Sequence, residues 1–185
     1  SLWSGLQSVM RNSIEYMPVR FQDNWMSYAG NSTSIDIRAA SQRPQWQWVY
    51  GLSNRSYTHR YQLGYTTIPN HGWTFSGTVA MRLAKESWNT GTHYSSIGYY
   101  FAVDKQFTHQ HRLSLVLFGN KTHNGKQAAI TMPVMLLFGN RYNPNWGYQN
   151  GVKRNAAVGA QHKPVMILTH EWQPNNHSSW QTSMG

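Results

Sequence analysis

The sequence predicts an all-β chain whose strands form part of a large antiparallel transmembrane β-barrel. From Pro44 onward, large apolar residues recur at every second position, which is the period of a β-strand. The opposite face of each strand carries Gln, Thr, Ser and Gly, where a soluble sheet would show Lys and Glu. Short and long connections alternate between the strands, as they do at the two rims of a membrane barrel.

The elements follow in order along the chain. Residues 1–43 have no sustained period and close with a four-residue strand pattern at 35–38. Residues 44–185 then give six clear strand segments and a seventh that begins near Ser179. The six lie at 46–52, 57–65, 73–81, 97–103, 113–117 and 165–172. This change of pattern predicts a boundary near residue 43.

The first two barrel segments also predict a register. If Asn54 and Arg55 form a two-residue hairpin loop, the numbers of paired residues add up to 109. Large side chains then face one another in four pairs: Leu52 with Tyr57, Tyr50 with His59, Trp48 with Tyr61, and Trp46 with Leu63. A slip of one residue would break all four pairs.

A soluble antiparallel sandwich or barrel also alternates and remains an alternative at this point. Trp and Tyr near the strand ends favour the membrane barrel, because aromatic residues gather at membrane interfaces. The chain of 185 residues contains no cysteine, which excludes disulfide scaffolds, cysteine-type zinc sites and thiol catalysis. The longest apolar stretch, residues 130–138, is too short to span a membrane as a helix.

The long connection between residues 120 and 163 is the candidate ligand-binding loop, since loops of this length are usually functional or disordered. Residues 127–138 are apolar enough to be ordered, and we expect a short helix broken at Pro133. The residues after it combine stacking rings, amides and cations, which suit sugars, peptides or anions: Arg141, Tyr142, Asn143, Asn145, Trp146, Tyr148, Asn150, Lys153 and Arg154. The alternative is that this run only packs the loop onto the wall.

No group of residues suggests catalysis, so the chain is not expected to be an enzyme and no cofactor is expected. The six acids are scattered one per segment, and no spacing forces a carboxylate pair. His109 and His111 would share a face of an extended strand, but in a short turn they are better read as solvated than as metal ligands. We therefore expect no metal site.

The chain carries 16 Lys and Arg against 6 Asp and Glu, a formal charge of +10. The basic residues are spread over strand ends and loops and do not cluster as nucleic-acid binding requires. In an outer-membrane barrel they would meet lipopolysaccharide phosphates or attract anionic cargo. A solvated face without function is the alternative.

Several stretches, in order along the chain, resemble the TonB-dependent outer-membrane receptors of Bacteroidetes-type bacteria. They are residues 5–12, 30–38, 54–60, 102–107, 142–151 and 153–155. The resemblance implies that residues 1–43 are the end of a plug domain and its linker, and that residues 44–185 are the first six to seven strands of the barrel. It places the plug–barrel junction at Gly30, Asn31, Ile35, Asp36, Ile37 and Arg38. Asp36 and Arg38 would share one strand face and could pair with charges on the barrel wall.

The family's barrel has about 22 strands, which need over about 400 residues, so we expect this chain to be an internal fragment. The resemblance implies nutrient uptake (a siderophore, haem, oligosaccharide or peptide) across the bacterial outer membrane. The expected partners are outer-membrane lipid and lipopolysaccharide, and a TonB-type energising protein that binds a segment not matched here. A surface lipoprotein or a larger envelope complex is a further candidate partner. Two alternatives stay open: a receptor-fold structural subunit, and a soluble basic β-domain that binds nucleic acid.

Overall fold

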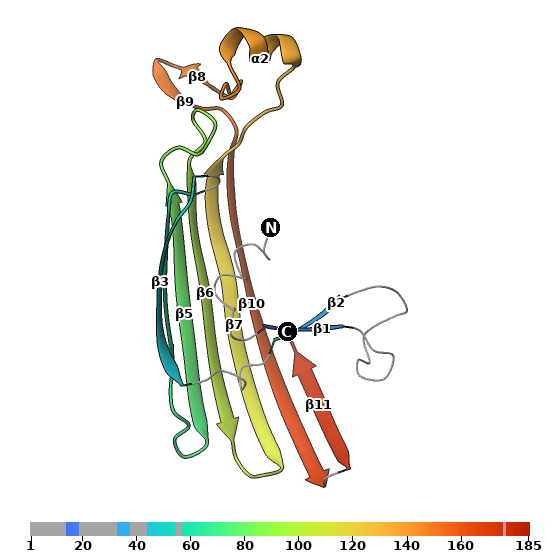
Figure 1. Cartoon of the computed structure of the whole chain (residues 1–185). Coiled ribbons are helices and arrows are strands. Elements are labelled where there is room, and N and C mark those ends of the chain that lie inside the picture. Colours follow the sequence, from blue (N-terminus) through green and yellow to red (C-terminus); the bar gives the residue numbers. More distant parts are fainter. Residues whose placement is uncertain (1–13, 19–32, 38–43, 55–56, 176) are drawn as a thin grey trace.

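A computed structural model describes residues 14–18, 33–37, 44–54, 57–175 and 177–185 of the chain (Figure 1). Strands β1 (Ile14–Pro18) and β2 (Thr33–Ile37) form an antiparallel pair of their own. The other strands are β3 (Gln45–Leu52), β4 (His59–Thr66), β5 (Trp73–Ala84), β6 (Tyr94–Gln106), β7 (His111–Gly125), β8 (Trp146–Gln149), β9 (Val152–Asn155), β10 (Val158–Asn175) and β11 (Ser178–Met184). One helix, α2 (Met132–Phe138), completes the described elements.

Seven strands form one tall antiparallel sheet in the order β11-β10-β7-β6-β5-β4-β3 (Figure 1). Each strand pairs with its neighbour along the chain, except that β8 and β9 form a separate hairpin within the connection from β7 to β10. The predicted all-β class is confirmed, and a strand of this sheet lies at each of the seven predicted strand segments. Among the described strands the sheet is open, with β3 and β11 at its edges.

The two ends of the sheet differ. At one end, called the short-turn end, brief turns join β4 to β5, β6 to β7, and β10 to β11. At the other, called the long-loop end, lie residues 53–58, 85–93 and 126–157. The predicted loop of residues 120–163 is therefore too long: β7 continues to Gly125 and β10 begins at Val158, and these two residues are themselves paired.

The predicted register of the first hairpin is wrong by two residues. Leu52 pairs with His59 and Tyr50 pairs with Tyr61, so paired numbers add up to 111. The loop comprises residues 53–58, and the backbone N–H of Ser53 donates to the carbonyl of Thr58 at 3.2 Å. Because the side-chain period of a strand is two, this shift keeps every large residue on the predicted face.

One face of the sheet is polar, and it is the better buried one. On β4 to β7 this polar face consists of the even-numbered residues, which the register aligns from strand to strand. Gln62 is 2% exposed and Ser96 is 3% exposed, and the Ser96 hydroxyl donates to Asn120 Oδ1 at 2.8 Å. The small apolar core lies on the same face: Ala80, Tyr100, Ala102, Val116 and Phe118.

The polar face also holds an ion pair. Asp104 on β6 is 5% exposed, and its two carboxylate oxygens share the N–H of Arg112 Nε, each at 2.9 Å. Arg112 Nη2 also donates to Asp104 Oδ2 at 2.6 Å. The hydroxyl of Ser114 donates to the same carboxylate at 2.5 Å. A buried carboxylate is stable only with such partners, so Arg112 and Ser114 fix the β6–β7 pair near the short-turn end.

The opposite face is apolar and exposed. It carries the odd-numbered residues of β4 to β7 and the even-numbered residues of β3 and β10. Trp48 is 71% exposed, and Leu63 and Phe101 are 55% and 46% exposed. Aromatic residues gather near both ends of this apolar face, with Tyr50 and Tyr61 by the long-loop end and Trp73, Trp172 and Trp180 by the short-turn end. The sheet thus hides its polar residues and exposes its large apolar ones.

Helix α2 differs from the prediction at one point. Pro133 lies in its first turn, where the missing N–H costs nothing, and does not break the helix. The helix stops at Gly139, which has a φ of 85° and whose N–H donates to the carbonyl of Met135 at 2.8 Å. None of its residues is buried, and Leu136 and Leu137 are nearly four-fifths exposed.

Candidate functional site

Residues 126–157, called the loop module, stand beyond the long-loop end of the sheet and contain α2, β8 and β9 (Figure 1). The loop module contacts the β5–β6 loop, residues 85–93, through backbone and side-chain hydrogen bonds. The N–H of Thr90 donates to the carbonyl of Arg141 at 3.0 Å, and Arg141 Nε donates to the carbonyl of Trp88 at 2.8 Å. Two connections far apart in the sequence thus form one structure.

Asn143, a predicted ligand residue, is part of the framework. Its side chain is almost fully buried, with 1% of the residue exposed. Its Nδ2 donates to the carbonyls of Thr90 at 3.1 Å and Lys126 at 3.3 Å, while its Oδ1 accepts from the N–H groups of Asn145 and Ala128. With all these bonds made inside the protein, the Asn143 amide holds the loop in place and does not face a ligand.

Two further asparagines serve the same framework. Asn155 Nδ2 donates to the carbonyls of Gly91 and Lys126, both at 2.9 Å, and its Oδ1 accepts from the N–H of Ala157. Asn145 Nδ2 donates to the same Lys126 carbonyl at 3.1 Å. The prediction that Asn145 binds ligand is therefore not supported by its geometry, and Asn155 is a framework residue that the sequence analysis missed.

Trp146 is half-buried against Gly91. A Cβ at Gly91 would lie 2.2 Å from the indole ring, and Gly91 has a φ of 72°, so only glycine fits there. One face of the ring is thereby occupied by the β5–β6 loop. Tyr142 is likewise engaged, since its ring stacks on Phe138 of α2 at a centroid distance of 4.9 Å.

The β8–β9 hairpin presents the exposed part of the predicted site. Asn150 and Gly151 both have positive φ, 52° and 79°, which makes a two-residue turn of the kind that matches the twist of a hairpin. Tyr148 is 75% exposed and pairs with Lys153, whose Nζ lies 5.8 Å from the Tyr148 ring centroid. Lys153 is equally close to the Trp146 ring. A ring and a cation side by side on an exposed turn can hold an anionic or planar group.

The loop module is positively charged. The loop module contains four basic residues and no acidic ones: Lys126, Arg141, Lys153 and Arg154. Arg154 Nε donates to Gln149 Oε1 at 2.5 Å, which holds the guanidinium along the hairpin. Five of the nine predicted residues are exposed: Arg141, Tyr148, Asn150, Lys153 and Arg154. Arg141 already donates to the carbonyl of Trp88, so the exposed residues of the hairpin are the other four.

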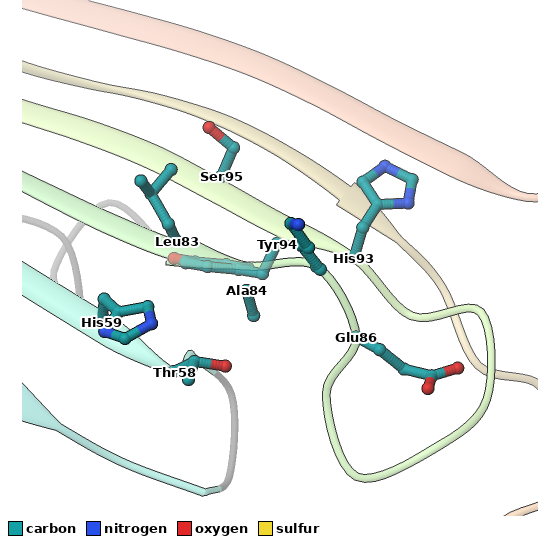
Figure 2. A pocket seen from close by; sticks show the side chains of 9 residues that line it. Thr58, His59, Leu83, Ala84, Glu86, His93, Tyr94 and Ser95 are labelled. Atoms are coloured by element: carbon teal, nitrogen blue, oxygen red, sulfur yellow. The ribbon is translucent and has the colours of Figure 1, made fainter.

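A hollow of about 600 Å³ lies at the base of the β5–β6 loop, between β4, β5 and β6 (Figure 2). Two of its titratable groups have partners: Glu86 Oε1 accepts from the N–H of Gly91 at 2.7 Å, and His59 Nδ1 lies 3.0 Å from the Tyr50 hydroxyl. It is lined by Thr58, His59, Leu83, Ala84, Lys85, Glu86, His93, Tyr94 and Ser95. The sequence gives no signal for this hollow: Leu83 and Ser95 in its lining are paired across β5 and β6, and the period of two does not predict which residues pair.

His93 belongs to this hollow and also to a histidine pair. Its Nε2 lies 3.2 Å from Nδ1 of His123 on β7. Burial lowers the pKa of His93 below its ordinary value, and the neighbouring His123 lowers the pKa further. His93 therefore favours its neutral form.

The predicted plug–barrel junction is described only in part. Ile35, Asp36 and Ile37 lie in β2, where the register places Asp36 opposite Glu15 of β1. Gly30, Asn31 and Arg38 lie outside the described residues. The proposed pairing of Asp36 and Arg38 with the wall stays a prediction.

Within the described ranges, no group of three or more His, Asp or Glu residues could hold a metal ion. No described helix has the length and apolar character needed to cross a membrane. Searches of protein-family models, of curated proteins and of solved structures gave no match to this chain.

Proposed function

We propose that this chain is a section of a TonB-dependent outer-membrane receptor that takes up a scarce nutrient: a siderophore, haem, oligosaccharide or peptide. In this proposal the seven-stranded sheet is part of a transmembrane β-barrel, with residues 1–43 as the end of a plug domain. The resemblance of six ordered stretches to that family gives the proposal its specificity, and the geometry of the sheet supplies independent support.

The observation that carries the proposal is the inverted burial of the two faces. In a water-soluble sheet the aromatic and aliphatic face is covered, because burying it drives folding. Here Trp48, Leu63 and Phe101 are exposed, while Gln62, Ser96 and Asn120 are buried. A hydrocarbon solvent reverses the preference of each face, and a barrel with a polar interior has this arrangement. The apolar face is therefore the lipid-facing side of the proposed wall.

Two further features support a membrane wall. The described sheet has two open edges, and unpaired edge groups in lipid would cost several kcal/mol each, so such a wall must continue into further strands. The strands also grow from 8 residues in β3 to 18 in β10, whereas a crossing needs about 9–11. The excess length of β7 and β10 would raise the loop module clear of the membrane.

In this proposal the exposed hairpin residues Tyr148, Lys153 and Arg154 meet the nutrient at the outer rim. Their ring and positive charges suit an anionic ligand or a sugar bearing acidic groups. The framework residues Asn143 and Asn155 would hold the hairpin in a fixed position, so little conformational entropy would be lost when the ligand binds.

The first test is a pair of lysine substitutions in the full-length protein. Phe101→Lys places a charge on the apolar face, where a membrane wall would lose about 2–4 kcal/mol near the bilayer centre. Val152→Lys makes the same kind of change at an exposed position of the hairpin. We expect F101K to reduce the outer-membrane, heat-modifiable form strongly and V152K to leave it unchanged. A soluble protein, in which both positions face water, would tolerate both.

The second test addresses uptake. A strain without the gene is grown on media that each limit one nutrient class, with and without a working TonB-type protein. We expect a growth defect on one medium, the same defect when the energising protein is absent, and a partial defect with Lys153→Gln and Arg154→Gln combined. Normal growth on every medium, with the protein still in the outer membrane, would favour a structural subunit.

A further inference from the structure

A second hollow, of about 770 Å³, lies on the apolar face at the short-turn end, beside the turn between β4 and β5. Its walls are largely aromatic and aliphatic: Trp73 and Phe75 stack with their planes 8° apart, and Ile68 at its edge is 75% exposed. The lining consists of Tyr65, Thr67, Ile68, Pro69, Asn70, His71, Trp73 and Phe75. This volume lies within the range of small-molecule sites.

The turn that borders this hollow is held firmly. His71 and Gly72 have φ of 49° and 77°, and the N–H groups of Asn70 and Trp73 donate to each other's carbonyls at 2.9 Å. The carbonyl of Gly72 accepts from the N–H of Gln106 at 2.8 Å, so the turn is tied to the end of β6. A site on such a turn is preorganised and would not have to form when its ligand arrives.

One cation stands at the edge of the hollow. Lys105 Nζ donates to the carbonyl of His71 at 2.9 Å and lies 4.7 Å from the Trp73 ring centroid. The centroid of the Phe107 ring lies 5.9 Å from the same Nζ. These contacts hold the ammonium group beside the apolar walls and use one of its three N–H bonds, which leaves two for a ligand.

Lys105 has no carboxylate partner among the described residues. Its neighbour Asp104 points to the polar face, where Arg112 and Ser114 already bind it. The ion pair formed within the described ranges is that of Asp104 with Arg112. A fixed positive charge at the rim of an apolar hollow, without an internal counter-ion, fits a ligand with one anionic group attached to hydrocarbon.

We propose that this hollow binds one glycerophospholipid of the leaflet at the short-turn end, with an acyl chain on Tyr65, Trp73 and Phe75 and the headgroup phosphate on Lys105. This rests on the proposed function, because it takes the apolar face to be the lipid-facing side. Trp and Lys at one level of a membrane wall mark the interface between hydrocarbon and headgroups. The phosphate accepts the two remaining Lys105 N–H bonds, and the hollow takes up the chain next to it.

The test uses full-length protein purified from outer membranes, delipidated in detergent and titrated with phosphatidylglycerol, with bound lipid counted by native mass spectrometry. Lys105→Met removes the charge and keeps the length of the side chain. Ile68→Asp places a carboxylate at the exposed edge of the hollow. Lys121→Met is the matched control, because Lys121 lies on the apolar face near the long-loop end and is exposed.

We expect one tightly held phosphatidylglycerol per protein, an affinity about fivefold lower in K105M and at least as low in I68D, and no change in K121M. Equal lipid binding in all four proteins would overturn the proposal. So would saturation of the Lys105 site by inorganic phosphate alone, or retention of lipopolysaccharide in place of phospholipid. Recovery of the protein from the soluble fraction would instead contradict the proposed function, so the two failures are distinguishable.

Discussion

The hydroxyl of Tyr99 on β6 lies 2.9 Å from Nε2 of His162 on β10, although β7 separates the two strands. The ring crosses β7 at Gly119, where a Cβ would lie 2.4 Å from the Tyr99 oxygen and 3.0 Å from the carbonyl of Lys163. Glycine at this position therefore allows one side chain to link three strands on the apolar face.

The first prediction follows from this crossing. Gly119→Ala forces the Tyr99 ring aside and breaks its bond to His162, so we expect the free energy of unfolding to fall by about 1–3 kcal/mol. Gly147→Ala is the control, since nothing lies within 4 Å of a Cβ there, and it should change stability by less than about 0.5 kcal/mol. Urea unfolding of both variants in detergent measures the difference. An equal effect of the two alanines would contradict the crossing.

A second prediction separates framework from ligand residues in the loop module. Asn143→Ala removes the side-chain donor to the carbonyl of Thr90 and one of the three amide donors to the carbonyl of Lys126. We expect a cost of about 1–3 kcal/mol and release of the loop module from the β5–β6 loop. Tyr148→Ala removes an exposed ring and should leave the module in place.

Limited trypsin digestion measures this release, because the module contains Arg141, Lys153 and Arg154 as cleavage sites. We expect cleavage there to be faster in N143A and unchanged in Y148A. If the proposed function holds, Y148A should weaken ligand binding in an uptake assay, while its digestion pattern stays that of the unaltered protein. Slow digestion of N143A would show that the asparagine is dispensable for the framework.

The third prediction concerns the ion pair on the polar face. Asp104→Ala leaves Arg112 half-buried without its carboxylate, and we expect a loss of about 1–3 kcal/mol, less than for a fully buried pair because the Arg112 side chain is 32% exposed. Asp104→Ala combined with Arg112→Ala removes both charges and should recover part of that loss. Thermal unfolding of the two single variants and the double variant gives the coupling energy. Strictly additive effects would mean that the pair contributes nothing.

The fourth prediction is a dependence of stability on pH. The pKa of His93 is lowered in the folded protein by burial and by His123, so the unfolded chain takes up this proton more readily. Above about pH 6.5 both states are neutral at His93 and the residue has no effect. As the pH falls from about 6.5 through the lower folded-state pKa, stability decreases, because protons favour the unfolded state.

His93→Gln should flatten this part of the profile, which urea midpoints between pH 7.5 and 5 would reveal as a smaller drop in the variant. Glu86 and His59 line the same hollow, so both should be kept unchanged in the comparison. Identical profiles for the two proteins would mean that other groups control the acid sensitivity.

The sequence predicted which residues share a face more reliably than it predicted which residues pair. A face depends only on the period of two, so Trp48 and Leu63 are on the expected side. Pairing depends on where the loop ends, and the loop between Leu52 and His59 is four residues longer than the tight turn assumed. A register shift of two residues keeps every side chain on the same face, so the apolar pattern is the same for both registers and does not distinguish them.

The upper part of β7 escaped prediction for a related reason. Asn120, Lys121 and Thr122 show no alternation of apolar and polar residues, yet they pair fully with β10. A segment whose side chains are polar on both faces has no apolar stripe, so a search for one does not detect its backbone pairing. The hairpin turn at Asn150 and Gly151 did carry a recognisable signal, but its strands of four residues are too short for a periodic pattern.

The candidate site was predicted from its amino-acid composition. Only the fold shows which of its residues hold the loop module together and which are exposed to a ligand. Asparagine serves equally well as a ligand donor and as a bridge between backbone groups, and the sequence does not distinguish these uses. Asn143 became a bridge because residues 85–93 lie against it, a contact across about fifty positions of the chain. Trp146 and its partner Asn155 contact the β5–β6 loop at the base of the hairpin. Tyr148 and Lys153 pair two positions nearer the turn and remain exposed there.

The long strands β7 and β10 and the short β8–β9 hairpin differ in how they resist a pulling force. A pull on the loop module is carried into the sheet by β7 and β10, which are joined from Val158–Gly125 to Trp172–His111. Because both strands are drawn in the same direction, the force loads the hydrogen bonds of β7 with β6 and of β10 with β11 in shear, many of them at once. The β8–β9 hairpin has four pairs and is loaded one rung at a time from its open end. Under tension the β8–β9 hairpin would therefore open before the sheet does. The sheet would stay paired, and the hairpin could form again when the tension ends.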